Sequence, residues 1–271
     1  MTQKFNRRVA MMLGAGAAAA ASGLPAWAAT AIKHYILVDL KPGTDQLVLD
    51  RWYMTFHAPE VRRAFKAWQR NYVSFRSYLP PEEARKAYPL QYGRMTEIHF
   101  DSLADFQDSR PNNIYARGLG SFTPPPGGWA NAGFESTTAS VPVNPQQVFL
   151  AKDTPPKETP YLRWIVFFRY PEGVTLEQGD AWYGDVHAKE VARLPGLRKY
   201  ALYSTVSAAA AYPRVAEMWF DDYAAWKDAF IPVPRFTAPT WGGQGLFVES
   251  ISMFVGENPD VDFINDKRVI P

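Results

Sequence analysis

The chain has 271 residues, of which 47% are hydrophobic, 15% aromatic and 21% charged, a globular composition that excludes disordered and fibrous proteins. Basic and acidic residues number 29 and 27, but three of the basic residues lie in a terminal leader, so the remainder is close to neutral. A nucleic-acid-binding protein needs a positive face for phosphates, so we expect no nucleic-acid partner. The sequence contains no cysteine, which excludes disulfides, thiolate metal sites and cysteine nucleophiles.

Residues 1–28 have the pattern of a secretory signal peptide. Basic residues, including the pair Arg7-Arg8, precede an apolar stretch at 9–24, and Ala26-Trp27-Ala28 has the small-x-small form of a cleavage site. The apolar stretch is short for a bilayer core ~30 Å thick, so we expect no stable membrane anchor. We expect a periplasmic or secreted protein cleaved after Ala28, and the paired arginines favour a twin-arginine signal over an ordinary one.

An internal repeat organises the rest of the chain. At an offset of 130 residues, Gly43, Asp50, Trp52, Tyr53, His57, Ala58, Glu60 and Val61 match Gly173, Asp180, Trp182, Tyr183, His187, Ala188, Glu190 and Val191. Further along, the offset falls to 120, where Arg94 and Glu97 match Arg214 and Glu217. The sequence therefore predicts a tandem duplication, with modules at 29–141 and 161–271 joined by a proline-rich extended connector at 142–160.

Both copies predict the element order strand, helix, strand, strand, helix, strand. The strands are expected at 34–40, 72–78, 96–100 and 135–141, and at 163–170, 200–205, 216–220 and 248–255. Pro59 predicts a break in the first helix of copy one, before a second helical segment at 60–69. Asp101 and Asp221 are expected to cap the second helices. This order predicts an α+β fold of two tandem ferredoxin-like modules.

A short signature carries a family resemblance. The pattern Trp-x4-His-Ala-x-x-Val occurs at 52–61 and 182–191, and copy two continues with Leu-Pro-Gly at 194–196. With the Phe-Asp-x-x-Ala turn before the second helix, this pattern resembles the EthD family of dimeric α+β barrel proteins. Copy one departs from it, with Trp68-Gln69-Arg70 where Leu-Pro-Gly is expected. The resemblance implies that the modules pair sheet to sheet as an intrachain barrel, and a homodimer of the chain is also open.

The relatives implied by this resemblance include polyketide cyclases, dehydratase-like and isomerase-like enzymes, cofactor-free monooxygenases and members without an assigned activity, so the fold does not fix the function. In catalytic relatives the helix histidine, here His57 and His187, looks like the general acid or base, a role that suits an imidazole near neutral pH. The alternative is that this histidine braces the helix break. Its presence in both copies slightly favours the structural role.

The other two histidines, His34 and His99, occur only in copy one, and copy two has Trp164 and Trp219 in their places. A ferredoxin-like sheet places its first and third strands side by side, so we expect the two histidines to be neighbours.

On the third strand, Ile98 and Phe100 should face the helices, so Glu97 and His99 should point together into the barrel. The prediction is a polar pocket of Glu97 and His99, with His34 nearby and His57 or Tyr72 at its rim. The alternative is that His99 is a hydrogen-bonded core residue. Arg94 and Arg214 lie on the opposite strand face from the repeated glutamates, and structural ion pairs explain them as well as catalysis does.

Aromatic insertions occupy the same place in each copy, at 122–129 and 235–247, and carry Trp129 and Trp241. They are either lids over an apolar pocket or surface turns with anchored aromatic side chains. The predicted substrate-binding residues are His34, Trp129, Trp219, Trp241 and His187.

These residues favour a periplasmic, cofactor-independent lyase or isomerase, dehydratase-like or cyclase-like, that acts by acid–base catalysis on an aromatic or polyketide-like molecule. His99 or His57 would be the base, Glu97 would orient or protonate, and Tyr72 would hold a developing oxyanion. One alternative is a non-catalytic binding protein for hydrophobic aromatic ligands. Another is a metal-dependent oxygenase with iron on His34, His99 and Glu97. The leading hypothesis includes neither metal nor cofactor.

Overall fold

The computed structural model describes residues 31–153, 160–231, 236–242 and 247–262. The predicted signal peptide lies outside these residues and stays a prediction. Within the described part of the chain, no helix is long and apolar enough to cross a membrane.

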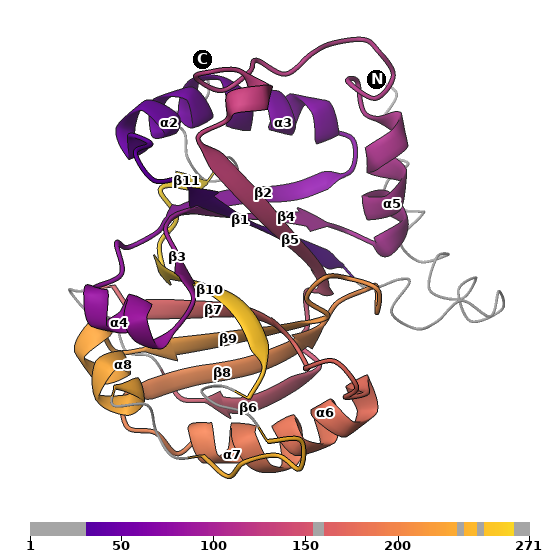
Figure 1. Cartoon of the computed structure of the whole chain (residues 1–271). Helices are drawn as coiled ribbons and strands as arrows, with labels where there is room; N and C mark the ends of the chain where they lie inside the picture. The colour runs from indigo at the N-terminus through magenta and orange to yellow at the C-terminus, as the bar shows by residue number, and fades with distance from the viewer. Residues whose placement is uncertain (1–30, 154–159, 232–235, 243–246, 263–271) are drawn as a thin grey trace, which may run out of the picture.

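The first module contains a four-stranded antiparallel sheet. Its strands are β1 (Ile32–Leu40), β2 (Gln69–Arg76), β4 (Gly93–Phe100) and β5 (Phe134–Pro142). They lie in the spatial order β2-β4-β1-β5, which is the ferredoxin-like order in which the first and third strands are neighbours. Helices α2 (Gln46–Trp52), α3 (Ala58–Phe65) and α5 (Leu103–Asn112) lie on its outer face (Figure 1).

The second module repeats this arrangement. Its strands are β7 (Leu162–Arg169), β8 (Leu197–Ser204), β9 (Arg214–Phe220) and β10 (Glu249–Gly256), in the order β10-β7-β9-β8. Helices α6 (Leu176–Trp182), α7 (Ala188–Val191) and α8 (Tyr223–Phe230) cover its outer face, so the molecule is layered helices, sheet, sheet, helices (Figure 1). The predicted α+β fold of two ferredoxin-like modules with facing sheets is confirmed.

Two short strands pair with strands of the opposite module. From the first half of the chain, β3 (Leu90–Gln91) pairs in parallel with β10, and from the chain's end β11 (Val261–Asp262) pairs with β2. The predicted connector contributes β6 (Gln147–Ala151), which pairs with β8, so this segment is a sheet edge as well as a link.

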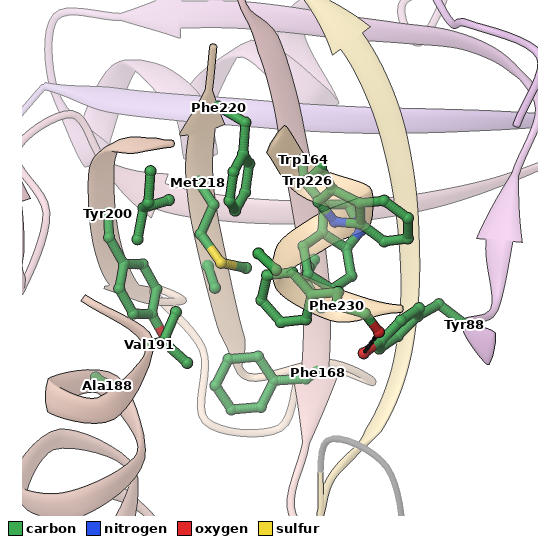
Figure 2. Packing of buried hydrophobic residues seen from close by; sticks show 14 of the residues in the cluster. Tyr88, Trp164, Phe168, Ala188, Val191, Tyr200, Met218, Phe220, Trp226 and Phe230 are labelled. Atoms are coloured by element: carbon green, nitrogen blue, oxygen red, sulfur yellow. Dashed lines mark hydrogen bonds between the residues drawn. The ribbon is translucent and has the colours of Figure 1, made fainter. Parts of the chain in front are cut away.

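Tyr88 directly follows helix α4 (Glu82–Ala87) in the first half of the chain, and its side chain lies in the core of the second module. There the Tyr88 ring lies edge-on to Trp164, Trp226 and Phe230, and its O–H donates to the Phe230 carbonyl at 3.3 Å (Figure 2). Aromatic rings in edge-to-face contact bury a large apolar area, so this crossing adds to the cohesion of the two modules.

The space between the two sheets is filled by side chains from both modules. The cluster contains Tyr35, Leu37, Val73, Phe75, Met95, Ala139, Val141, Ile165, Phe167, Tyr203, Val215, Met253 and Val255. These residues alternate along their strands with residues that pack against the helices, as expected for strands buried on both faces.

The first helix of each copy contains a π-helical turn, at Tyr53–His57 and Tyr183–His187, where Ala58 and Ala188 donate to the carbonyls of Tyr53 and Tyr183. The predicted break at Pro59 is wrong, since the helix continues through the proline. Copy two has the same turn with Lys189 in that place, so the proline does not cause it. The π-turn places residues i and i+5 together, and His57 stacks on Trp52 at 4.9 Å.

The predicted caps of the second helices are displaced by one residue. Ser102 and Asp222 are the N-caps, accepting from the backbone N–H groups of Asp105 and Ala225. Asp101 and Asp221 instead pair with Arg70 and Arg198. The structure also has a short 3-10 turn at Trp129–Asn131 in the first insertion.

Candidate functional site between the sheets

Glu97 lies on β4 with its carboxylate between the sheets, because its neighbours Ile98 and Phe100 pack against the helices. Arg163 reaches it from β7 of the other module, and its Nη2 donates to Glu97 Oε1 at 2.8 Å. The same nitrogen donates to Glu217 Oε1 at 2.8 Å, and Arg163 Nε adds a third bond at 3.1 Å. One guanidinium therefore joins the equivalent glutamates of the two copies.

Lys33 balances the charge of this cluster. Its Nζ lies 3.6 Å from Glu217 Oε2, so two cations and two carboxylates share the barrel interior. Burial alone would raise the pKa of Glu97 and of Glu217, but Arg163 and Lys33 outweigh it and hold the pKa of each carboxyl well below its usual range. Both glutamates are therefore ionised at neutral pH.

The two glutamates differ in how far their oxygens are satisfied. Glu217 also accepts from the Tyr35 O–H at 3.0 Å and from Trp219 Nε1 at 2.8 Å, so both of its oxygens have donors. The second oxygen of Glu97, Oε2, instead faces His99 Nε2 at 3.5 Å. Copy two holds an indole, which does not exchange protons near neutral pH, where copy one holds an imidazole. Among the described residues, the imidazole beside this cluster therefore lies on the first-module side.

His99 is the more exposed member of the Glu97–His99 pair. Its side chain is 24% exposed, against 8% for Glu97. Asn71 of β2 is its register partner on the same face of the sheet. Among the described residues, Asn71 Oδ1 is a buried atom with no hydrogen-bond partner, and His99 Nε2 has only the contact with Glu97 Oε2 at 3.5 Å. Buried polar atoms are nearly always paired, so this group has the capacity to bind a small polar ligand or water.

The prediction that His34 joins this pocket is wrong. In the antiparallel register, His34 is opposite Ile98 and therefore faces the helices, whereas Lys33 is opposite His99 and faces the barrel. The predicted iron triad of His34, His99 and Glu97 is not formed, because its members lie on opposite faces of the sheet. The described residues also contain no group of three or more histidines and carboxylates arranged to hold a metal.

His57 and Tyr72 also lie on the helix side of the first sheet, not at the rim of the Glu97–His99 pocket. Tyr72 is opposite Ile98 in register, and its O–H meets the Tyr53 O–H at 2.5 Å. Tyr200 and Tyr183 repeat the pair at 2.6 Å in copy two.

The helix histidines are held among aromatic rings. His57 and His187 stack on Trp52 and Trp182, at 4.9 and 5.0 Å. Burial lowers the pKa of each to about 4, which the nearby glutamates only partly oppose. Each has a buried Nδ1 without a partner among the described residues. In copy two, a small apolar cavity of about 10 Å³ lies beside His187 and Tyr183. It has room for about one water molecule.

The tryptophans divide in the same way. Trp129 and Trp241 lie edge-on to Trp52 and Trp182, beside the first helix of each module. Trp129 is 51% exposed, which fits a surface turn with an anchored ring. Trp219 alone of the predicted substrate-binding residues lies with the charged cluster, with Arg163 over its ring at 5.2 Å and Lys199 Nζ at 4.2 Å.

Three residues of this site were not predicted from the sequence: Arg163, Lys33 and Asn71. A signal for the first two was present, since they occupy equivalent positions 130 residues apart and are both basic. The repeated Arg94 and Arg214 form ion pairs on the helix side, with Asp50 and Asp180, as the structural alternative predicts.

Comparison with known proteins gives similarity of architecture only. No family model and no curated protein matches the chain. Among solved structures, an anthrone oxidase-like protein is 13% identical with a TM-score of 0.49, over 86% of this chain and 92% of that one. A variant of chlorite dismutase from Candidatus Nitrospira defluvii is 5% identical with a TM-score of 0.46, over 83% of this chain and 91% of that one. The fold assignment rests on the strand order of the two sheets.

Proposed function

We propose that the chain is a small-molecule lyase or isomerase that moves a proton beside the interior charged cluster, with His99 as the base. The observation that carries the proposal is a part-exposed imidazole, His99, whose Nε2 faces the ionised Glu97 carboxylate at 3.5 Å beside the unpartnered Asn71 Oδ1. No other imidazole in the described chain lies next to the interior charged cluster.

The geometry suggests a different role for each residue. Ionised Glu97 facing Nε2 favours the tautomer with the proton on that nitrogen, which leaves His99 Nδ1 to take a proton from the substrate. Glu97 thus orients the imidazole and does not act as the acid, because Arg163 and Lys33 keep it charged. Asn71 lies beside the imidazole, and its free Oδ1 can accept a hydrogen bond from a substrate O–H or N–H. Trp219, beyond Arg163, supplies an aromatic wall for a flat substrate.

An experiment in heavy water tests this function. The protein is incubated in D2O with a panel of aromatic ketones that carry exchangeable hydrogens next to the carbonyl, and deuterium uptake is followed by mass spectrometry. We expect wild-type protein and the control variant His57→Gln to accelerate exchange. In His99→Gln the exchange rate should be at least 100-fold lower than in the wild type. Undiminished exchange with His99→Gln would overturn the assignment of the base.

A second candidate function is binding of hydrophobic aromatic ligands without turnover. The observation that favours it is a surface pocket of about 390 Å³ with mainly apolar walls, formed by Tyr78, Leu79, Leu162, Tyr223 and Phe254 among others. Leu79 is 63% exposed there. If this pocket is the functional site, Leu79→Asp abolishes ligand binding and His99→Gln does not.

Export and the EthD resemblance are further parts of the proposal. The support for export is the leader sequence, and its test is the N-terminus of the protein recovered from the periplasm or medium, which should be Ala29. Replacing Arg7-Arg8 with two lysines should block export by the twin-arginine route and leave an ordinary secretory route working.

A further inference from the structure

A second polar site lies at the β5 edge of the first sheet, in an open groove of about 620 Å³ that includes His34 of the helix-side face. One wall is the edge strand β5 with the end of α5, and the other is the 205–212 loop between β8 and β9 of the second module. The Val206 N–H donates to the Ser140 carbonyl at 2.8 Å, which fixes the loop against the strand. Both modules therefore contribute to the groove, as they do to the barrel interior.

Arg110 supplies the groove with a positive charge. Arg110 is exposed, and its guanidinium is oriented by the Phe106 ring beneath it at 4.7 Å and by His34 Nε2 at 3.3 Å. Among the described residues no carboxylate pairs with it, in contrast to Arg94, Arg163 and Arg214. A positioned guanidinium with free donors matches the planar fork of a carboxylate.

His34 sets the polarity of the groove floor. A guanidinium only donates, so His34 Nε2 accepts from Arg110 and the ring proton is on Nδ1. That N–H donates to Ser140 Oγ at 2.8 Å, which leaves the Ser140 hydroxyl proton free to donate into the groove. Burial and the charge of Arg110 lower the pKa of His34 to about 3, so the ring is neutral and Arg110 is the only cation of the floor.

Hydroxyl groups continue from this point along the strand. Ser136, Thr138 and Ser140 alternate on β5 and line the groove on the same face as His34. A single positive charge beside a row of hydroxyls suits a ligand with one negative charge and several oxygen atoms. A phosphate dianion would be better matched by two or more cations.

We propose that this groove binds a small organic carboxylate, whose carboxylate group pairs with Arg110 and whose oxygen substituents bond to the hydroxyls of β5. The site is separate from the proposed proton-transfer site, since His34 and His99 face opposite sides of the sheet. Its ligand is recognised by charge and hydroxyl contacts, not by the aromatic wall of the barrel.

Isothermal titration of the full mature chain with benzoate, glucuronate and inorganic phosphate tests the proposal. The variants are Arg110→Gln, Arg110→Lys and the control Arg117→Gln, which removes an exposed arginine that lies after α5 and does not line the groove. We expect glucuronate to bind more tightly than benzoate, because only glucuronate offers hydroxyls to β5. Glucuronate affinity should fall at least tenfold in Arg110→Gln, fall less in Arg110→Lys, and be unchanged in Arg117→Gln and His99→Gln.

Each other outcome overturns the proposal. Equal losses in Arg110→Gln and Arg117→Gln would mean general attraction to surface charge. Tighter binding of phosphate than of either carboxylate would contradict the ligand class, and the absence of saturable carboxylate binding would remove the site. If Arg110→Gln lowers the melting temperature, Ser140→Ala serves in its place and should weaken glucuronate binding several-fold. Loss of proton exchange in His99→Gln with intact glucuronate binding separates this proposal from the proposed function.

Discussion

Lys33 and Arg163 occupy equivalent positions in the two copies, and both reach the same carboxylate, Glu217, at 3.6 and 2.8 Å. The duplicated modules therefore share their charges across the interface instead of each forming its own pair. Because Arg163 also binds Glu97, the cluster is a structural link between the modules as well as the support of His99.

Removing the shared guanidinium should destabilise the protein strongly. Arg163→Met leaves two buried carboxylates without their main partner, and we expect the free energy of unfolding in urea to fall by about 3–5 kcal/mol. The control is Arg169→Gln, which breaks an exposed ion pair with Glu249 and should cost at most about 1 kcal/mol. Similar losses in the two variants would contradict the role given to the interior cluster.

Stability should decrease in two steps as the pH falls. Burial lowers the pKa of His57 and of His187 from 6.5 to about 4, so the unfolded state binds more protons than the folded state between these values. Stability is therefore lost as the pH falls from 6.5 to 4, by at most about 3 kcal/mol for each histidine. The lowered pKa values of Glu97 and Glu217 add a further loss as the pH falls below about 4.5.

Urea unfolding at pH 7, 6, 5, 4 and 3 measures this profile. The double variant His57→Gln, His187→Gln should make the first step smaller and keep the second. The part of the first step that remains comes from His34, whose pKa is lowered to about 3 by burial and by Arg110. If the free energy of unfolding of the double variant depends on pH between 6.5 and 4 as steeply as that of the wild type, the helix histidines are not buried as neutral rings.

Gly179 should not tolerate alanine, although alanine is the better helix former by about 1 kcal/mol. A Cβ at this position of α6 would lie 2.2 Å from the Tyr170 ring, which is held by its O–H donating to Asp180 Oδ1 at 2.8 Å. We expect Gly179→Ala to lower the free energy of unfolding by about 1–3 kcal/mol.

The control places Gly179→Ala in a protein that also carries Tyr170→Leu. Copy one has Leu40 in the place of Tyr170 and Leu49 in the place of Gly179, so a larger side chain fits when the ring is absent. In that background the alanine should be neutral or stabilising. A double-mutant cycle gives the coupling energy, and a value near zero would show that the ring moves away freely.

The repeat made much of the fold predictable. Matching positions at offsets of 130 and 120 imply two modules of one topology, and that topology places β4 beside β1. Alternation along β4 then correctly places Glu97 and His99 in the interior. The exchanged strands β3 and β11 have two residues each, which is too short for a periodic pattern.

The errors have definite physical causes. His34 and His99 lie on neighbouring strands, but the side chains of a strand change face at every residue, so a register one residue away from the expected one separates them. The π-turns depend on a hydrogen-bond pattern that residue spacing does not reveal, and Pro59 suggested a break instead. Arg163 was not predicted, because the contrast between the copies is at Trp164, one residue further and on the opposite face of the strand.

The chain contains four histidines, so the imidazole region of a ¹H–¹⁵N spectrum locates the site directly. The measurement is a titration of ¹⁵N-histidine-labelled protein with the ketone that exchanges fastest, with resonances assigned by single His→Gln variants. Our account predicts that the His99 signals shift with saturation while those of His57, His187 and His34 stay in place. Shifts confined to His57 or His187, with His99 unmoved, would place the site between sheet and helices and contradict it.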